Sequence, residues 1–170
     1  MSSVVDMCRR EKELTKEFVL NIDKWDTVDE FVKQIVSTGW KNIKFLNEEG
    51  IGLNDAVNTI PNDKGGIYVF VLQPEILPLI HRYILYIGRA KRNKSFSLRK
   101  RCQSYLTDDR IEIAYMRELW GKSLYFYYLP IDDDEIIERV EEELLRVIIP
   151  PCNKQIPARY VTVSSGKTAF

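Results

Sequence analysis

The chain has 170 residues, with 25 lysines and arginines balanced by 25 aspartates and glutamates, and 45% of its residues are hydrophobic. This hydrophobic content is normal for a packed core and argues against a wholly disordered chain. The balanced charge excludes a uniformly basic nucleic-acid-coating protein, although a local basic patch stays open.

The first 60 residues are expected to form a helical extension. Apolar residues recur at helical spacing within residues 26–40, with Asp26 or Thr27 as the expected N-cap, and a short helix is expected over residues 53–60. The turn cluster PNDKGG at 61–66 marks the expected boundary of the next domain. A dimer surface, a DNA clamp and a docking site for a protein partner are all open roles for residues 1–60.

From Gly65 the expected element order is ββααβα. Strands are expected at about 66–73 and 82–88, helices at 98–106 and 109–120, a third strand at 123–131, and a helix at 132–149 that Pro150 and Pro151 end. The predicted fold class is therefore α+β, with a small, mainly antiparallel three-stranded sheet flanked by helices over residues 61–153. Residues 154–170 are expected to be a tail.

Cysteine and histidine usage limits the chemistry. The three scattered cysteines, Cys8, Cys102 and Cys152, indicate no disulfide framework and favour a reducing cytoplasm. His81 is the only histidine, so a His-rich zinc site and an HExxH motif are excluded, and His81 is expected at the surface. No stretch approaches 18 apolar residues and no apolar leader is evident, so neither a membrane span nor a signal peptide is expected.

Residues 89–101 hold a concentration of positive charge, because seven of these thirteen residues are lysine or arginine. Charge alone slightly favours a solvated loop. The functional alternative is a patch that contacts the phosphates of a nucleic acid.

Two further charged residues are expected to turn toward the core. Arg101 shares a helix face with Leu98 and Leu106, so it needs an anionic partner or a ligand. On the last helix, Glu141 falls within the apolar stripe, whereas Glu142 and Glu143 fall outside it, toward solvent. A carboxylate in that position is either the ion-pair partner of an inward arginine or a ligand of a hard cation such as Mg²⁺. The residues alone favour the ion pair.

Residues of about 60–153 resemble the GIY-YIG nuclease domain, notably its excision-repair branch. The stretch GGIYVF matches the first motif, LYIGRA the second, LRKRCQSYL the helix that follows, and EEELLRVIIPPCN the metal-binding helix and its asparagine. Two loops are longer than is usual in the family: residues 74–82, which look inserted, and the stretch between Gly88 and Arg101. The repair branch often has lysine after YIG, where this chain has Arg89.

The resemblance implies a metal-dependent endonuclease that hydrolyses phosphodiester bonds, most often in DNA, with Mg²⁺ or Mn²⁺ as cofactor. It implies that Glu141 holds the metal, that Arg101 neutralises the phosphate, and that Tyr68 is the candidate general base. Tyr86 and Tyr105 would orient water or phosphate. The expected substrate-binding residues are Gly88, Arg89, Lys91, Arg92, Lys94, Lys100 and Asn153, the last as a brace of the site. The alternative is an inactive nucleic-acid-binding module or a partner-docking protein on the same fold.

Overall fold

A four-stranded antiparallel sheet organises the chain in the computed structural model, which describes residues 19–20, 22–77, 80–91 and 96–153. The strand order is β2 (Lys41–Lys44), β5 (Leu124–Ile131), β3 (Gly65–Leu72) and β4 (Tyr83–Ala90). The α+β class is confirmed, but the three-strand count was wrong. The additional strand, β2, comes from the extension that was expected to be helical, and it pairs with β5.

The α-helices of the described residues are α2 (Ile22–Asp26), α3 (Glu30–Ser37), α4 (Leu98–Ser104), α5 (Ile111–Trp120) and α6 (Asp134–Val147). Two 3-10 turns, η1 (Asp55–Thr59) and η2 (Gly121–Ser123), and two short paired strands, β1 (Val19–Leu20) and β6 (Ile148–Ile149), complete the chain. The expected order ββααβα is not matched, because η2 precedes β5 and β6 follows α6. None of the helices in the described part of the chain is long and apolar enough to cross a membrane.

Two helix boundaries differ from the sequence expectation for local reasons. The N-cap of α3 is Asp29, whose carboxylate accepts a hydrogen bond from the backbone N–H of Phe31 at 2.8 Å, and not Asp26 or Thr27. Helix α6 ends at Val147, two residues early, because Ile148 and Ile149 pair with β1.

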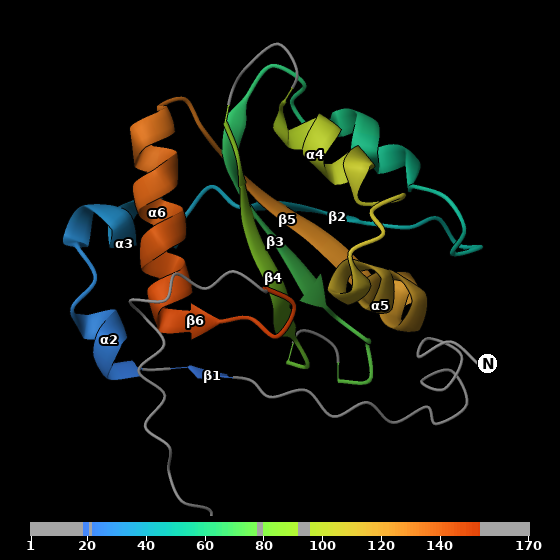
Figure 1. Cartoon of the computed structure of the whole chain (residues 1–170), viewed down its shortest axis with the longest axis horizontal. Coiled ribbons are helices and arrows are strands. Elements are labelled where there is room, and N and C mark those ends of the chain that lie inside the picture. Colours follow the sequence, from blue (N-terminus) through green and yellow to red (C-terminus); the bar gives the residue numbers. More distant parts are fainter. Residues whose placement is uncertain (1–18, 21, 78–79, 92–95, 154–170) are drawn as a thin grey trace, which may run out of the picture.

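Helices cover both faces of the sheet (Figure 1), and a hydrophobic core lies on each face. Side chains alternate along β3, so Ile67, Val69 and Val71 pack toward α6 whereas Tyr68 and Phe70 pack toward α4 and α5. The predicted apolar stripe of α6 is buried against the first of these faces. Residues on both sides of the expected boundary at 60/61 belong to the same cores. Phe45 lies in one core with Tyr68, and Val32 lies in the other core with Ile67.

Strand β4 lies at an edge of the sheet and contains a β-bulge. Phe70 pairs with Tyr86 and Val71 pairs with Ile84, so Leu85 is an extra residue and both Leu85 and Tyr86 join the core under α4 and α5. The segment after α6 covers part of the open edge, since the Cys152 N–H donates to the Leu85 carbonyl at 2.9 Å. Cys102 and Cys152 are buried, whereas Cys8 lies outside the described residues.

Candidate functional site

Three tyrosines meet beneath α4. Antiparallel pairing of β3 with β4 places Tyr68 opposite Gly88 and stacks its ring near that of Tyr86, with centroids 6.3 Å apart. Tyr105, the C-cap of α4, supplies a third ring, and its hydroxyl lies 2.7 Å from that of Tyr68. Tyr68 and Tyr105 are each 0% exposed, whereas Tyr86 is half-buried. Pairing of the two strands therefore brings Tyr68 and Tyr86 together.

The glycine of the second tripeptide makes room for Tyr68. A Cβ atom at Gly88 would lie 2.5 Å from the Tyr68 hydroxyl oxygen and 2.6 Å from its Cζ atom. Any side chain at this position would therefore displace the phenol that binds Tyr105. Gly88 leaves room for the Tyr68 ring because it has no side chain. Its expected role in substrate binding stays a prediction.

Arg101 lies half-buried against the tyrosine pair. Its Nη2 atom donates to the Tyr68 hydroxyl at 3.3 Å, and its guanidinium carbon lies 5.6 Å from the centroid of the Tyr105 ring. Its Nε atom is buried and has no hydrogen-bond partner within the described part of the chain. No carboxylate of residues 22–77, 80–91 or 96–153 forms an ion pair with it, so the predicted need for an anion is unmet by the described protein groups.

The environment of the tyrosines opposes their ionisation. Burial raises the pKa of Tyr68 above its usual value of 10.0, and the nearby charge of Arg101 offsets only part of that rise. Burial also raises the pKa of Tyr105. At neutral pH both groups are therefore neutral phenols in this arrangement, which does not favour Tyr68 as a general base.

Glu141 lies on the other side of the β4 edge, and its side chain is 16% exposed. Its Oε2 atom is 2.9 Å from Nη1 of Arg89, whose Nη2 atom lies 3.5 Å from Glu138. Burial raises the pKa of Glu141, and the charges of Arg89 and, more weakly, Arg101 counter that rise. The predicted ion pair with an arginine is present, and Arg89 is that arginine.

The three consecutive glutamates have different surroundings. Glu142 is exposed, as expected. Glu143 was expected to face solvent freely, but it accepts hydrogen bonds from Arg146 at 2.6 and 3.2 Å, because Arg146 lies on the same side of α6 one turn later. Glu141 is the carboxylate of the three that reaches the edge of β4.

Glu141 can hold a divalent cation only if most of the other ligands of the cation come from outside the described residues. No group of three or more His, Cys, Asp or Glu side chains able to hold a metal occurs among the described residues. Mg²⁺ commonly uses one or two protein carboxylates and takes its remaining oxygen ligands from water and substrate phosphates. The single hard oxygen donor of Glu141 is compatible with that mode of binding.

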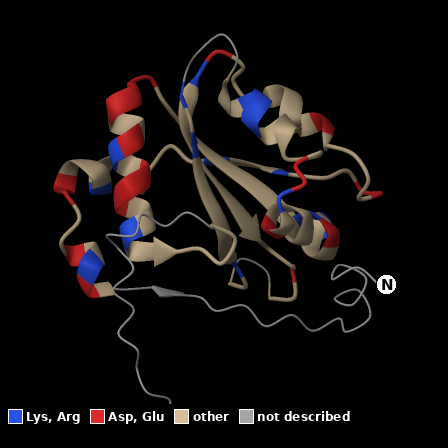
Figure 2. Cartoon of the chain, in the orientation of Figure 1, with Lys and Arg blue, Asp and Glu red and all other residues tan. Residues whose placement is uncertain are grey.

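The remaining expected binding residues differ in their surroundings. Asn153 accepts from the Ile87 N–H at 2.9 Å and donates to the Ile87 carbonyl at 2.7 Å, which anchors the segment after α6 to β4. Lys91 pairs with Glu138, and Lys100 is exposed on α4. Figure 2 shows the acidic residues along α6, beside the basic upper end of β4. Arg92 and Lys94 lie outside the described residues.

One residue of this site, Arg110, was not expected from the sequence. The guanidinium carbon of Arg110 lies 5.9 Å from the centroid of the Tyr86 ring and 5.7 Å from that of Tyr105. Asp108 holds Arg110 through contacts of 2.7–3.1 Å, and these hydrogen bonds lower the pKa of the Asp108 carboxyl. An aspartate two residues before an arginine is too common a pattern to have predicted this position.

Comparison of the chain with protein-family models, with curated proteins and with solved structures finds no match.

Replacing Gly88 with alanine should destabilise the protein by about 1–3 kcal/mol, because the added methyl group overlaps the Tyr68 phenol. Urea unfolding monitored by circular dichroism measures the change. Gly52→Ala is the matched control, since a Cβ there meets only the side chain of Asn47 at 3.3 Å. Equal stability of the two variants would contradict the packing described for Tyr68.

Proposed function

We propose that this protein is a metal-dependent endonuclease of the GIY-YIG type, which hydrolyses phosphodiester bonds in DNA. The observation that carries the proposal is the environment of the Arg101 guanidinium. Its guanidinium is half-buried, its Nε atom lacks a hydrogen-bond partner among the described residues, and two tyrosine side chains fix its orientation. A phosphate would supply the negative charge that no described carboxylate gives this guanidinium.

The arrangement suits phosphoryl transfer, which asks a protein mainly to position groups and to neutralise charge. Arg101 would contact the equatorial oxygens of the scissile phosphate, where its planar fork fits. Arg110 presents a second guanidinium near the Tyr86 and Tyr105 rings, and its side chain is 48% exposed. It is therefore accessible to a neighbouring phosphate of the same strand.

Glu141 would hold the divalent cation, Mg²⁺ or Mn²⁺, which when bound polarises the phosphate and stabilises the leaving oxygen. The ion pair with Arg89 favours the ionised form of the Glu141 carboxyl, despite its partial burial. Glu138 gives Arg89 and Lys91 another carboxylate partner. These two basic residues are thus already paired within the protein, and they are weaker candidates for phosphate contacts than Arg101.

Tyr68 and Tyr105 fit a positioning role better than a proton-transfer role. Both rings are fully buried, and burial holds the pKa of each above that of an ordinary phenol. The Tyr68 hydroxyl accepts a hydrogen bond from Arg101, so the pair fixes the guanidinium in the direction of the β4 edge. Tyr86, which is half-buried, remains available to orient water or phosphate.

The direct test is cleavage of plasmid and linear duplex DNA by the purified protein. We expect cleavage with Mg²⁺ or Mn²⁺ and none with excess EDTA, because Glu141 offers the cation its binding site. Single-stranded DNA and RNA substrates in parallel establish the substrate class. Binding without cleavage under every metal condition would support the inactive nucleic-acid-binding alternative and reject the enzyme.

Glu141→Gln should abolish cleavage and binding of Mn²⁺ at this site, whereas Glu142→Gln, its matched control, should preserve both. Calorimetric titration of Mn²⁺ and a cleavage assay provide the two readouts. Full activity in Glu141→Gln, or its loss in Glu142→Gln alone, would reject Glu141 as the metal ligand.

The same substitution should not destabilise the metal-free protein at neutral pH. Because burial raises the pKa of Glu141 above 4.5, the ionised carboxylate costs the folded state stability as pH rises from 4.5 through the folded-state pKa. Below that window the carboxyl is protonated in both states and costs nothing. The thermal midpoint of Glu141→Gln, relative to the unsubstituted protein, should therefore rise between about pH 4 and about pH 7. A relative fall would contradict the assigned direction of the shift.

Tyr68→Phe distinguishes positioning from proton transfer. If the hydroxyl positions Arg101, the variant should lose at least about tenfold in kcat, in the range seen for misplaced catalytic groups, with an unchanged shape of the pH–rate profile. If Tyr68 is the general base, the rise in rate with pH that its ionisation produces should disappear. Loss of this rise from the pH–rate profile of the variant would support Tyr68 as the general base.

A further inference from the structure

Asp108 fixes the orientation of the Arg110 guanidinium through one edge of that group. The Asp108 carboxylate accepts hydrogen bonds from Nε and Nη2 of Arg110 at 2.7–3.1 Å, and it also accepts the Arg110 backbone N–H at 3.0 Å. None of these hydrogen bonds uses the Nη1 atom of Arg110. Because a guanidinium is a rigid planar fork, a carboxylate bound at one edge sets the direction in which the remaining N–H groups point.

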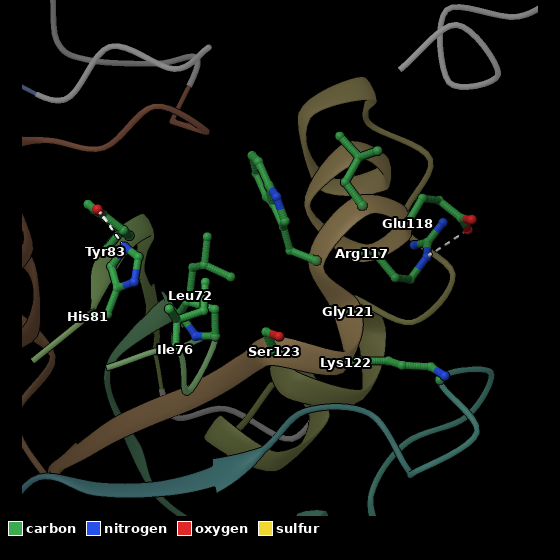
Figure 3. A pocket seen from close by; sticks show the side chains of 13 residues that line it. Leu72, Ile76, His81, Tyr83, Arg117, Glu118, Gly121, Lys122 and Ser123 are labelled. Atoms are coloured by element: carbon green, nitrogen blue, oxygen red, sulfur yellow. Dashed lines mark hydrogen bonds and ion pairs between the residues drawn. The ribbon is translucent and has the colours of Figure 1, made fainter. Parts of the chain in front are cut away.

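The loop that carries this pair is braced from α5. Arg117, whose Nε atom lies 3.8 Å from a carboxylate oxygen of Glu118 (Figure 3), donates from Nη1 to two backbone carbonyls of the loop. These are the carbonyls of Tyr105 and Asp108, at 3.1 and 2.9 Å. The Asp108 side chain is only 17% exposed. The carboxylate is therefore held in a fixed place relative to Tyr105.

Arg110 lies close to Arg101. The two guanidinium carbons lie 5.7 and 5.6 Å from the centroid of the same Tyr105 ring, so they are at most the sum of these distances apart, about 11 Å. Phosphates of one strand follow one another at about 3.4 Å along the axis of a DNA duplex. Two guanidiniums this close can therefore bind different phosphates of the same strand.

Pairing with a carboxylate has different consequences at Arg110 and at Arg89. Nη1 and Nη2 of Arg89 lie near Glu141 and Glu138 respectively, so both ends of its fork face protein carboxylates. Asp108 takes only the Nε and Nη2 edge of Arg110, whose side chain is 48% exposed. An arginine that is ordered before its ligand arrives does not have to lose its rotamer freedom on binding. Asp108 can therefore strengthen the binding of an anion by Arg110.

We propose that Asp108 is a positioning residue of the site, which holds Arg110 ready to bind a phosphate next to the one that Arg101 contacts. The inference rests on the proposed function for the identity of the ligand, a phosphodiester strand. Asp108 itself does not touch the substrate. Its carboxylate favours binding through Arg110, although its own negative charge repels the phosphates.

Removal of the Asp108 charge separates positioning from simple electrostatics, because the two effects have opposite signs. Loss of a negative charge beside a phosphate-binding group should by itself tighten the binding of DNA. If Asp108 positions Arg110, Asp108→Asn should instead weaken binding about three- to tenfold, because Arg110 must then be ordered during binding. Fluorescence anisotropy of a short labelled DNA duplex, with the full chain in EDTA, measures the change without cleavage.

Asp109→Asn is the matched control. Asp109 is the exposed neighbour of Asp108, and its substitution removes the same charge from the same loop. This variant should bind the duplex at least as tightly as the unsubstituted protein. Asp108→Asn keeps an oxygen that can accept the Arg110 backbone N–H, and circular dichroism of each variant verifies folding.

Arg110→Ala tests the group through which Asp108 acts. Loss of one phosphate contact should weaken binding and reduce the slope of log affinity against log salt by about 1. Asp108→Asn added to Arg110→Ala should bind no more weakly than Arg110→Ala alone, because the carboxylate then has no guanidinium to position. In a cleavage assay, Asp108→Asn should raise KM and leave kcat nearly unchanged, because Arg110 contacts a phosphate that does not react.

Unchanged or tighter binding by Asp108→Asn would overturn the proposal, as would an equal loss of affinity when Arg110 is already alanine. Absence of DNA binding by the unsubstituted protein would overturn it together with the nuclease. If Asp108→Asn weakens binding but no DNA is cleaved with Mg²⁺ or Mn²⁺, the nuclease proposal fails and the positioning role stands. If DNA is cleaved and Asp108→Asn binds as tightly as the unsubstituted protein, the reverse is true.

Discussion

The close approach of the Tyr68 phenol to the backbone of Gly88 is the contact on which the rest of the candidate site depends. Strand pairing sets Tyr68 directly opposite Gly88, and only a residue without a Cβ leaves room for the ring. With the ring in place, its hydroxyl reaches Tyr105 at the end of α4 and receives a hydrogen bond from Arg101. The GIY and YIG tripeptides are therefore physically coupled: one supplies the phenol and the other supplies the space for it.

The parts of the fold that could be predicted from sequence are those with a strong hydrophobic period. The apolar stripe of α6 identified that helix, and the same stripe set Glu141 apart from Glu142. The inward position of Arg101 followed from its neighbours on α4. In each of these cases, local geometry alone decides which way a side chain points.

What the sequence could not supply depends on contacts between distant segments. Strand β2 is four residues long, and its burial pattern has little alternation, so pairing with β5 is what makes it a strand. The pairing of Glu141 with Arg89 rather than Arg101 depends on how α6 crosses the edge of β4. Arg110 reaches the tyrosines because Asp108 holds it, and His81 is half-buried beside the Tyr83 ring. None of these contacts produces a periodic pattern of hydrophobic residues in the sequence.

The edge of β4 is where the two halves of the candidate site come together. Arg101 and the tyrosines approach it from the face covered by α4, and Glu141 approaches it from the face covered by α6. Asn153 occupies the hydrogen-bonding groups of Ile87 on this edge, and the next two residues are Gly88, which faces Tyr68, and Arg89, which pairs with Glu141. A metal-bound phosphate would be expected at that point of the strand.

Paramagnetic broadening by Mn²⁺ in a nuclear magnetic resonance titration tests this convergence most directly. At low Mn²⁺, the account predicts that the backbone amide signals of Gly88, Arg89 and Glu141 broaden first and together. The signals around Tyr83 should persist at the same concentration, and Glu141→Gln should suppress the effect. Broadening that begins instead at the exposed first turn of α6, around Asp133 and Glu135, would contradict a metal site at the edge of β4.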